Sequence, residues 1–384
     1  MSPPAPHIHP QRDDPDQPAR SRSGANRPSR AAGREQTAGR AQADNRVKAA
    51  IRKQATDREQ AAVRKHTAGQ AQADNRVKAA IREQAAALGF DALGIARAET
   101  LENHQPLLSA YLEKGHHGKM GYMARHIDKR LDPRLLLKGA RSVIVAAHNY
   151  YPAVGQAEGT SYRIARYAYG QDYHRVIKDK LHKLAQAVEE IAGKHTCRVF
   201  TDSAPVLEKA WAERAGLGKT GKNTCFIIPR KGSYLFLGEI ITTMDLAPDE
   251  AFEKDLCGHC RRCMDACPTQ AITDAGQLDA RRCLSYLTIE LKDRIPDEFR
   301  AKSRGWVFGC DICQEVCPHN RFAAPSNEKA FRPITAVAEW TDKEWEEMDR
   351  ERFNRHIRKA GSPLGRITYD KMMDNIRCAA ESRR

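Results

Sequence analysis

The sequence predicts an α+β fold in which a mixed α/β domain precedes a cysteine-rich domain and a short helical C-terminal segment. Three observations predict it. Buried-strand and amphipathic-helix patterns follow one another from about residue 77. Eight of the eleven cysteines fall within residues 257–317, and the last residues of the chain are helical in character. We therefore expect segments at residues 1–76, 77–250, 251–325 and 326–384.

Length and charge limit the class of protein. A chain of 384 residues is long enough for two or three domains with substantial cores. No apolar stretch approaches the roughly 18 residues that a membrane span needs. The net charge of +15 favours a polyanionic partner such as a nucleic acid, although a solvated surface has the same composition. Residues 1–85 carry 17 Lys and Arg against nine Asp and Glu, which is over half of the excess.

The N-terminal segment contains an internal repeat. Residues 1–36 are rich in Pro, Arg, Ser, Ala and Gly and lack apolar periodicity, so we expect disorder there. Residues 37–52 recur as residues 67–82 with only Arg40 changed to Gln70. Two copies are fewer than a solenoid needs, so we interpret them as a duplication of the domain's first helix. Residues 1–76 then form a disordered basic extension. A nucleic-acid-binding arm and a transit peptide are the alternatives.

The middle of the chain carries the signals of a mixed α/β domain. The apolar run at residues 142–147 predicts a buried strand. Two apolar stretches at 225–228 and 234–237, with a turn between them, predict a hairpin. An amphipathic helix that ends near Gly193 is predicted by Ile177, Leu181, Leu184, Val188 and Ile191. In the C-terminal segment we expect Trp340, Trp345, Met348 and Phe353 to pack.

The cysteines count out to two iron–sulfur clusters. The spacing of Cys257, Cys260, Cys263 and Cys267-Pro268 is that of bacterial ferredoxins, in which the fourth cysteine binds the other cluster. The second run has Val307 where its first ligand would stand, and Cys283 lies between the runs to replace it. We expect one 4Fe–4S cluster on Cys257, Cys260, Cys263 and Cys317, and another on Cys267, Cys283, Cys310 and Cys313.

Other uses of these cysteines are weighed against the clusters. Two four-cysteine zinc sites need the same number of thiolates, but the interleaved run is the ferredoxin pattern. Disulfides are not expected, because the chain shows no signal peptide and dense cysteines in a cytosolic protein indicate metal. Cys197, Cys225 and Cys378 are left over, and we expect them to be small buried hydrophobic residues.

A second motif surrounds Asp202. Asp202-Ser-Ala-Pro follows a strand-like stretch, and a glycine-rich loop follows at residues 215–224. An Asp before a Ser is most often a helix cap, and the glycines match neither the dinucleotide-binding nor the P-loop pattern. No nucleotide site is therefore predicted here.

These motifs together resemble the epoxyqueuosine reductases. The resemblance covers residues 77–384 and includes the eight cysteines, Asp202-Ser-Ala-Pro with Glu208, and the glycine-rich loop that ends in Gly221-Lys222-Asn-Thr224. Two further stretches are similar to the family, namely Arg166-Tyr-Ala-Tyr-Gly-x-Asp-Tyr-His174 and Gly361-Ser-Pro-Leu-Gly-Arg-Ile367.

The resemblance implies a cytoplasmic tRNA-modification enzyme. It implies reduction of epoxyqueuosine at the tRNA wobble position to queuosine, with two 4Fe–4S clusters, cobalamin and an external electron donor such as a flavodoxin or ferredoxin system. It implies a nitroreductase-like cobalamin-binding domain at residues 77–250, in which the corrinoid has no histidine ligand from the protein. Asp202 matches the family's proton donor and Arg125, Lys222 and Thr224 match cobalamin contacts, with Asp202 itself lying against the cofactor.

The chemistry is consistent with these parts. Converting an epoxide to an alkene takes two electrons and expels oxygen as water, so a proton donor has to meet that oxygen. For Asp202 to act as an acid near pH 7, we expect an apolar pocket to raise its pKa. Two departures stand out: Lys219 replaces a common aromatic residue, and the HEAT-like extension of longer members is absent. A reductive dehalogenase and a ferredoxin-type carrier fused to an RNA-binding domain are the alternative functions.

Overall fold

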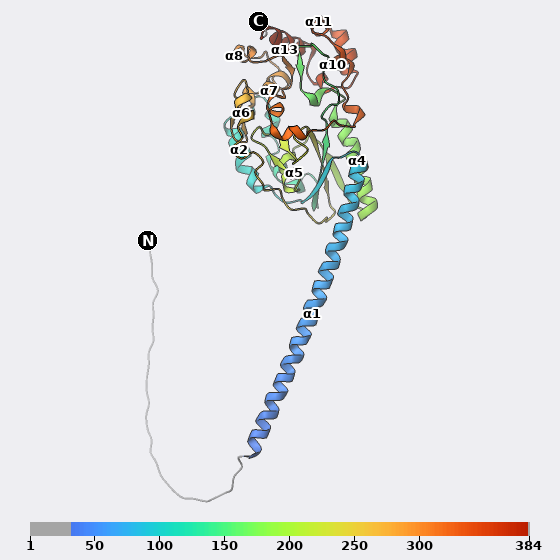
Figure 1. The fold of residues 1–384 in the computed structure, drawn as a ribbon, viewed down its shortest axis with the longest axis vertical. Helices are drawn as coiled ribbons and strands as arrows, with labels where there is room; N and C mark the ends of the chain where they lie inside the picture. Colours follow the sequence, from blue (N-terminus) through green and yellow to red (C-terminus); the bar gives the residue numbers. More distant parts are fainter. Residues whose placement is uncertain (1–31, 383–384) are drawn as a thin grey trace, which may run out of the picture. The chain divides into compact units, whose positions relative to one another are not determined.

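The computed structural model describes residues 32–382, so the disorder expected for residues 1–31 lies outside the described part (Figure 1). The chain consists of two compact units, and the boundary between them lies between Gly69 and Gln70. The first unit contains the beginning of helix α1, Ala32–Ala87. The second unit contains the end of α1 and the rest of the chain.

The long helix differs from the disordered extension that we expected over residues 32–76. These residues are helical. They are rich in Ala, Gln, Arg and Lys, which are strong helix formers, and they contain no proline. Low hydrophobicity predicts that a segment builds no core, but it does not prevent a helix. The second repeat is the domain's first helix, as expected, because Ile81 and Ala85 are buried in the core of the second unit.

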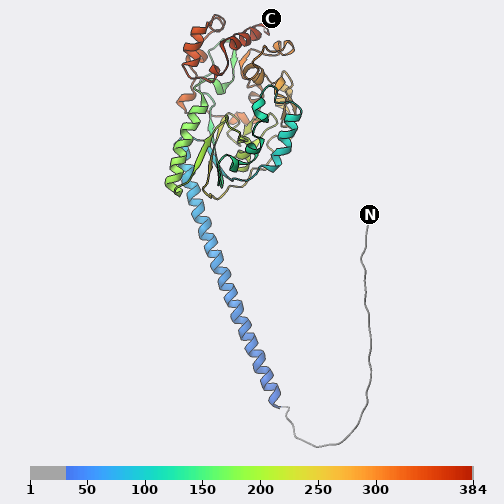
Figure 2. The same cartoon turned by 180° about the vertical axis from the view of Figure 1, so that it is seen from behind.

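An antiparallel four-stranded sheet forms the centre of the second unit (Figure 2). Its order is β1 (Ala92–Arg97), β2 (Ser142–Asn149), β7 (Leu235–Thr242) and β4 (Cys197–Phe200). The predicted buried strand is confirmed as β2, which is apolar along its length because helices cover both faces of the sheet.

Helices on the two faces create two cores. Helix α4 (Tyr173–Ala192) and the last turns of α1 lie against the face that presents Ile144 and Ile240 (Figure 1). The predicted amphipathic helix is confirmed as α4, and Gly193 ends it with φ of 98°. Helix α5 (Glu208–Arg214) packs Trp211 against the opposite face.

The predicted hairpin is wrong. Strand β6 (Phe226–Ile227) pairs with β5 (Lys219–Thr220), and a single bridge joins Ile228 to Gly232. Residues 235–237 belong instead to β7, where they pair with residues 147–149 of β2. Local alternation of apolar residues does not distinguish the partner of a strand.

The cysteine-rich and C-terminal parts share a core with the mixed domain. Strand β10 (Trp306–Phe308) pairs in parallel with β3 (Arg163–Ile164), and the C-terminal helices close over them. These helices are α10 (Thr335–Glu339), α11 (Asp342–Glu346), α12 (Arg350–Phe353) and α13 (Tyr369–Glu381). The four expected packing residues, Trp340, Trp345, Met348 and Phe353, are all buried, which confirms their assignment.

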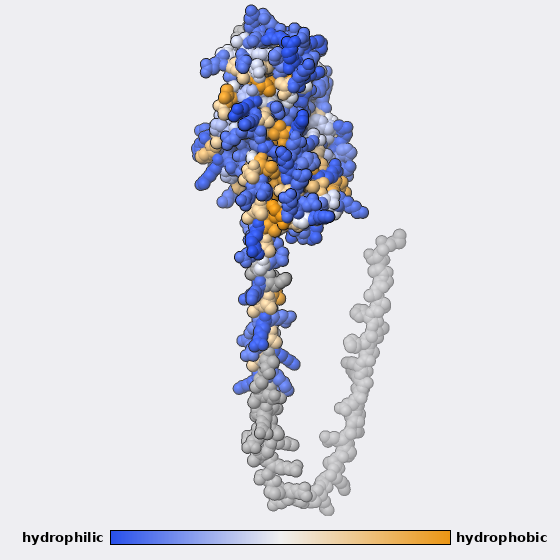
Figure 3. Space-filling view, turned by 90° about the vertical axis from the view of Figure 1, so that its right-hand side faces the viewer, coloured by the Kyte–Doolittle hydropathy of each residue, from blue (hydrophilic) through white to orange (hydrophobic). Residues whose placement is uncertain are grey.

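Polar residues cover most of the face seen in Figure 3. Shorter helices and strands complete the second unit. The cysteines lie on or beside α6 (Arg262–Ala266), α7 (Leu284–Ile289) and α9 (Ile312–Glu315). The others are α2 (Gln105–Glu113), α3 (Ile127–Leu131), α8 (Asp297–Arg300), β8 (Ile272–Asp274) and β9 (Gln277–Leu278). In the described part of the chain, none of the helices has the length and apolarity to cross a membrane.

Candidate active site

Asp202 lies in the loop between β4 and α5, with its carboxyl held by the first turn of α4. The hydroxyl of Tyr173 donates to Oδ2 of Asp202 over 2.5 Å, and Nε2 of His174 lies 3.1 Å from the same oxygen. The side chain of Asp202 is 48% exposed. Its carboxyl is therefore fixed on the protein side and open on the other.

A second carboxylate orients His174. Asp172 caps α4 by accepting the backbone N–H of His174, and its Oδ1 lies 2.7 Å from Nδ1 of the same residue. Burial lowers the pKa of His174, but hydrogen bonds to Asp172 and Asp202 outweigh burial and raise this pKa to about 9. The imidazole is therefore protonated at neutral pH and stores a proton beside Asp202.

The pKa of Asp202 is shifted in the opposite direction from our expectation. Burial raises this pKa, but the hydrogen bonds from His174 and Tyr173 and the charge of His174 outweigh it, and the pKa is lowered overall. We had expected an apolar pocket to raise it. The sequence did not reveal that two donors converge on the carboxyl. The proton of this site accordingly rests on His174 when Asp202 is ionised.

Further charged and aromatic residues near Asp202 were missed from the sequence. The charge of Arg366 helps to lower the pKa of Asp202. Burial raises the pKa of Tyr122 to about 12, with Glu290 and then Asp202 adding to the effect. A signal was present, because Tyr173, His174 and Arg366 all stand in the stretches that carry the family resemblance. Nothing in the sequence showed that these stretches meet.

The glycine-rich loop connects the Asp202 region to both groups of cysteines. The ammonium of Lys222 donates to the carbonyl oxygens of Gly258 and Cys260 over 2.6 and 3.1 Å. Nδ2 of Asn223 donates to the carbonyl of Cys313 over 3.2 Å. The next residue of the loop is tied to α5, because the carbonyl of Thr224 accepts a hydrogen bond from Nζ of Lys209 over 2.8 Å.

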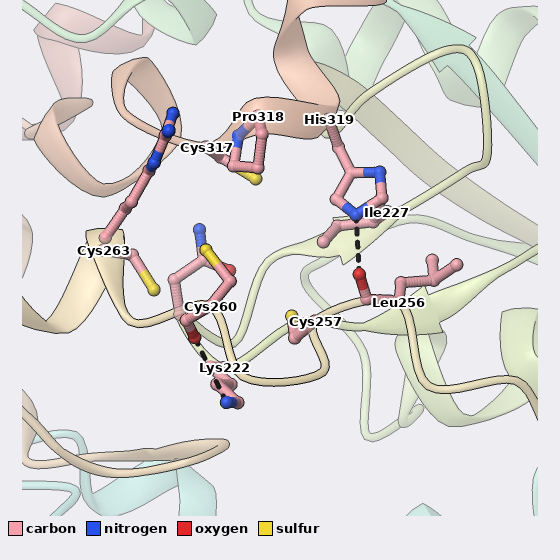
Figure 4. Close-up of a pocket in the computed structure, with 11 residues that line it drawn as sticks. Lys222, Ile227, Leu256, Cys257, Cys260, Cys263, Cys317, Pro318 and His319 are labelled. Carbon is pink, nitrogen blue, oxygen red and sulfur yellow. Dashed lines mark hydrogen bonds between the residues drawn. The ribbon is translucent and has the colours of Figure 1, made fainter.

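The first predicted set of cysteines surrounds one pocket. Cys257, Cys260, Cys263 and Cys317 line it together with Lys222 and His319 (Figure 4). Burial raises the pKa of Cys263 to about 11, and the thiols of Cys313, Cys257 and Cys317 add to the effect. Thiolates that crowd in this way need a cationic partner, and a 4Fe–4S cluster supplies one.

Thiols of the second predicted set influence one another's pKa. Burial raises the pKa of Cys283 to about 11, with contributions from Cys313 and Cys267. Burial likewise raises the pKa of Cys310, and Cys283 and Cys313 are among the contributing neighbours. Val307, at the position of the missing ligand, is a fully buried core residue of β10.

The three remaining cysteines differ from one another. Cys378 is buried, as expected, whereas Cys197 and Cys225 are only half-buried. The thiol of Cys225 is a hydrogen-bonding neighbour of Cys313. Cys225 is therefore not a scattered residue, because the turn after Asn223 returns it to the second set.

The three residues that we expect to contact cobalamin besides Asp202 do not share one environment. Arg125 is exposed and follows a short 3-10 helix, Gly121–Ala124. Thr224 has φ of 63° and is half-buried in the glycine-rich loop. The ammonium of Lys222 is directed to the first cysteine loop, as described above. Lys219 forms an ion pair with Glu213 over 2.8 Å.

The site fits a corrinoid without a histidine ligand. The only histidine of the Asp172-Tyr-His174 stretch has both ring nitrogens beside carboxylates, at 2.7 and 3.1 Å. It is therefore not free to bind a metal. The half-exposed carboxyl of Asp202 leaves an open side on which a large cofactor and a substrate can meet.

Comparisons with known proteins agree with this arrangement. Residues 256–320 match the family model of a 4Fe-4S double cluster binding domain, and residues 130–203 match that of epoxyqueuosine reductase QueG, DUF1730. The chain is 50% identical over 293 residues to epoxyqueuosine reductase of Cyclobacterium marinum, which covers 76% of this chain and 93% of that protein. It is 48% identical over 292 residues to that of Leadbetterella byssophila, covering 76% and 94%.

Solved structures give the same result. The crystal structure of an epoxyqueuosine reductase with an epoxyqueuosine-modified tRNA-Tyr stem loop matches with a TM-score of 0.74 and 30% identity. The match covers 80% of this chain and 82% of that one. By sequence and by fold, this chain belongs to the epoxyqueuosine reductase family.

Proposed function

We propose that this protein reduces epoxyqueuosine to queuosine in tRNA, as an oxidoreductase of the cytoplasm. Two 4Fe–4S clusters are held by the two sets of cysteines, and cobalamin is held on the open side of Asp202. The relatives' names give the reaction, and the tRNA stem loop in the related structure supports tRNA as the partner.

One observation supports the proposal most directly. A single loop contacts the backbone of both cysteine sets, through Lys222 and Asn223, and is tied through Thr224 to the helix that follows Asp202. This connection supports a role in which the proposed cluster ligands and the Asp202 carboxyl act together. A simple electron carrier has no need of the carboxyl.

The residues of this chain supply the protons. When bound, the clusters pass single electrons and cobalamin brings reducing equivalents to carbon. Asp202 delivers a proton to the oxygen that leaves, and His174, protonated at neutral pH, returns a proton to Asp202 through Nε2. Arg125 and Thr224 would contact the corrinoid, and Lys222 would join the glycine-rich loop to the first cluster through the carbonyls of Gly258 and Cys260. An external flavodoxin or ferredoxin system supplies the electrons.

The test is turnover of the loaded enzyme. The protein is purified anaerobically, loaded with iron, sulfide and cobalamin, and mixed with a reductant and epoxyqueuosine-containing tRNA, after which the nucleosides are analysed. We expect queuosine in amounts that exceed the enzyme. Unchanged epoxyqueuosine together with dehalogenation of a small organohalide would favour a dehalogenase instead. Cluster oxidation without any product would favour an electron carrier.

A further inference from the structure

A fully buried carboxyl stands in the central sheet behind the Asp202 loop. Glu239, on β7, lies opposite Val145 of β2 and Phe200 of β4, and none of its surface is exposed. Among the described residues, no N–H or O–H group satisfies either of its oxygens. Burial raises the pKa of Glu239 well above its usual range, and the charge of Glu208 adds to this. Because a buried carboxylate with no cation or donor beside it is costly, Glu239 is protonated.

Glu208 connects this buried carboxyl to Asp202. Oε1 of Glu208, the first residue of α5, accepts the backbone N–H of Asp202. The carboxyl of Glu208 is also within hydrogen-bonding reach of Glu239. Two carboxyl groups bond to each other only when a proton lies between them. Burial raises the pKa of Glu208 to about 8 and Asp202 adds to the effect, while Lys209 and His174 oppose it.

The backbone of Asp202 needs such a partner. Its φ of 53° is in the left-handed region. Residues other than glycine adopt this conformation at a cost of about 1–3 kcal/mol, and they keep it only when their surroundings hold them. Tyr173 and His174 hold one oxygen of the carboxyl, but they leave the backbone free to rotate. Glu208 is the group that holds the N–H.

We propose that Glu208 and Glu239 are positioning residues for Asp202. Protonated Glu239 bonds to Glu208, and Glu208 holds the backbone of Asp202 so that its carboxyl meets His174. The inference rests on the proposed function, because it assigns the pair to the proton donor of that reaction. It also predicts an alkaline loss of turnover: above pH 8, ionised Glu208 places a second negative charge beside Asp202.

Two substitutions of Glu208 distinguish its hydrogen bond to the backbone of Asp202 from the space that its side chain fills. Glu208→Met keeps the volume but accepts no hydrogen bond, whereas Glu208→Gln retains an acceptor for the N–H. Because a displacement of about 1 Å at a reacting group costs on the order of 100-fold, we expect Glu208→Met to lower kcat about 10- to 100-fold with little change in KM. Glu208→Gln should lose less than about threefold at pH 7, on the same reasoning. Glu190→Met, on the exposed face of α4, is the matched control.

The pH profile tests the proton of the pair. In the wild type we expect kcat to fall on the alkaline side near pH 8, where Glu208 ionises. In Glu208→Gln the fall should move towards pH 9, where His174 loses its proton. Glu239→Gln, which still donates, should preserve more activity than Glu239→Met. An unchanged profile in Glu208→Gln would contradict the inference.

Hydrogen exchange gives a readout that does not need turnover. In the loaded enzyme, Glu208→Met should speed exchange in the peptide containing residues 200–208, whereas Glu208→Gln and Glu190→Met should not. If the wild type makes no queuosine but this exchange pattern holds, the proposed function fails and the positioning stands. If the wild type is active and Glu208→Met matches it in kcat and exchange, the positioning is overturned. Equal loss in the Met and Gln variants, with unchanged exchange, overturns it too.

Discussion

The hydroxyl of Tyr173 donates a 2.5 Å hydrogen bond to Oδ2 of Asp202. The Tyr173 ring is itself fixed, because it stacks on Phe236 of β7 at 4.1 Å between ring centres and 5° between planes. It also stacks on His174 at 4.2 Å. The position of the Asp202 carboxyl is thus set by aromatic packing on the central sheet.

Removing this hydroxyl should slow turnover without unfolding the protein. Tyr173→Phe retains the stacking but loses a hydrogen bond to a charged group, which is worth about 1.5–3 kcal/mol. Since about 1.4 kcal/mol is tenfold in rate, we expect kcat to fall about tenfold or more. Steady-state rates and a melting curve measure the two effects. Wild-type kcat in this variant would show that Tyr173 only packs.

The hydrogen bonds of His174 with Asp172 and Asp202 should make the free energy of unfolding depend on pH above neutrality. The pKa of His174 is raised from 6.5 to about 9 in the folded protein. Its contribution to stability is therefore complete below about pH 6.5 and is lost as the pH rises through about 9. We expect the difference in melting temperature between the wild type and His174→Gln to shrink from pH 6 to pH 10. A constant difference would contradict the assigned charge.

Cys283 should be required for one cluster only. Cys283→Ser replaces a thiolate by a poorer ligand for iron, in the set that contains Cys267, Cys310 and Cys313. Iron should fall from about eight towards about four per chain, given four irons per cubane. Iron analysis and electron paramagnetic resonance spectra measure this outcome. Undiminished iron and unchanged spectra would remove Cys283 from the ligands, and Cys225, beside Cys313, would become the candidate.

The N-terminal part should be dispensable for chemistry. Deleting Met1–Asn75 leaves Lys78 and Ile81, of which Lys78 pairs with Asp249 over 2.9 Å and Ile81 is fully buried. We expect clusters, cobalamin binding and turnover to be largely retained. As a positive control, Ile81→Ala should cost about 2–5 kcal/mol of stability. A several-fold loss of tRNA affinity with a shallower salt dependence would show instead that the deleted part grips phosphate.

Elements with strong local patterns were predictable. The apolar run at residues 142–147 predicts a buried strand, and the periodic apolar residues of α4 predict an amphipathic helix. The structure confirms both. The hairpin failed because the choice between β6 and β2 as partner of β7 is made by the whole sheet. The helix over residues 32–76 was missed because helix propensity and core formation are separate properties of a segment.

The site was predictable where ligand number constrains it. Eight thiols divide into two sets of four. One pocket is lined by the first set, and burial together with thiols of the second set raises the pKa of Cys283 and of Cys310. The surroundings of Asp202 were not predictable in the same way. Tyr173, Glu208 and Glu239 lie on three different elements, and only the fold brings them together. The lowered pKa of Asp202 follows from that convergence.

The most direct test of the central claim is single turnover in Asp202→Asn with clusters and cobalamin fully loaded. Asn keeps the size and some hydrogen bonding of Asp but has no transferable proton. General acid catalysis is worth about 10² to 10⁴ in rate, so we expect conversion of epoxyqueuosine in tRNA to slow by at least about 100-fold. Asp202 does not cap α5, whose N-cap is Leu207, and the side-chain oxygen of Asn can still accept the hydrogen bonds of Tyr173 and His174. Near-normal conversion in the loaded variant would therefore show that Asp202 is structural and would contradict its role as the proton donor.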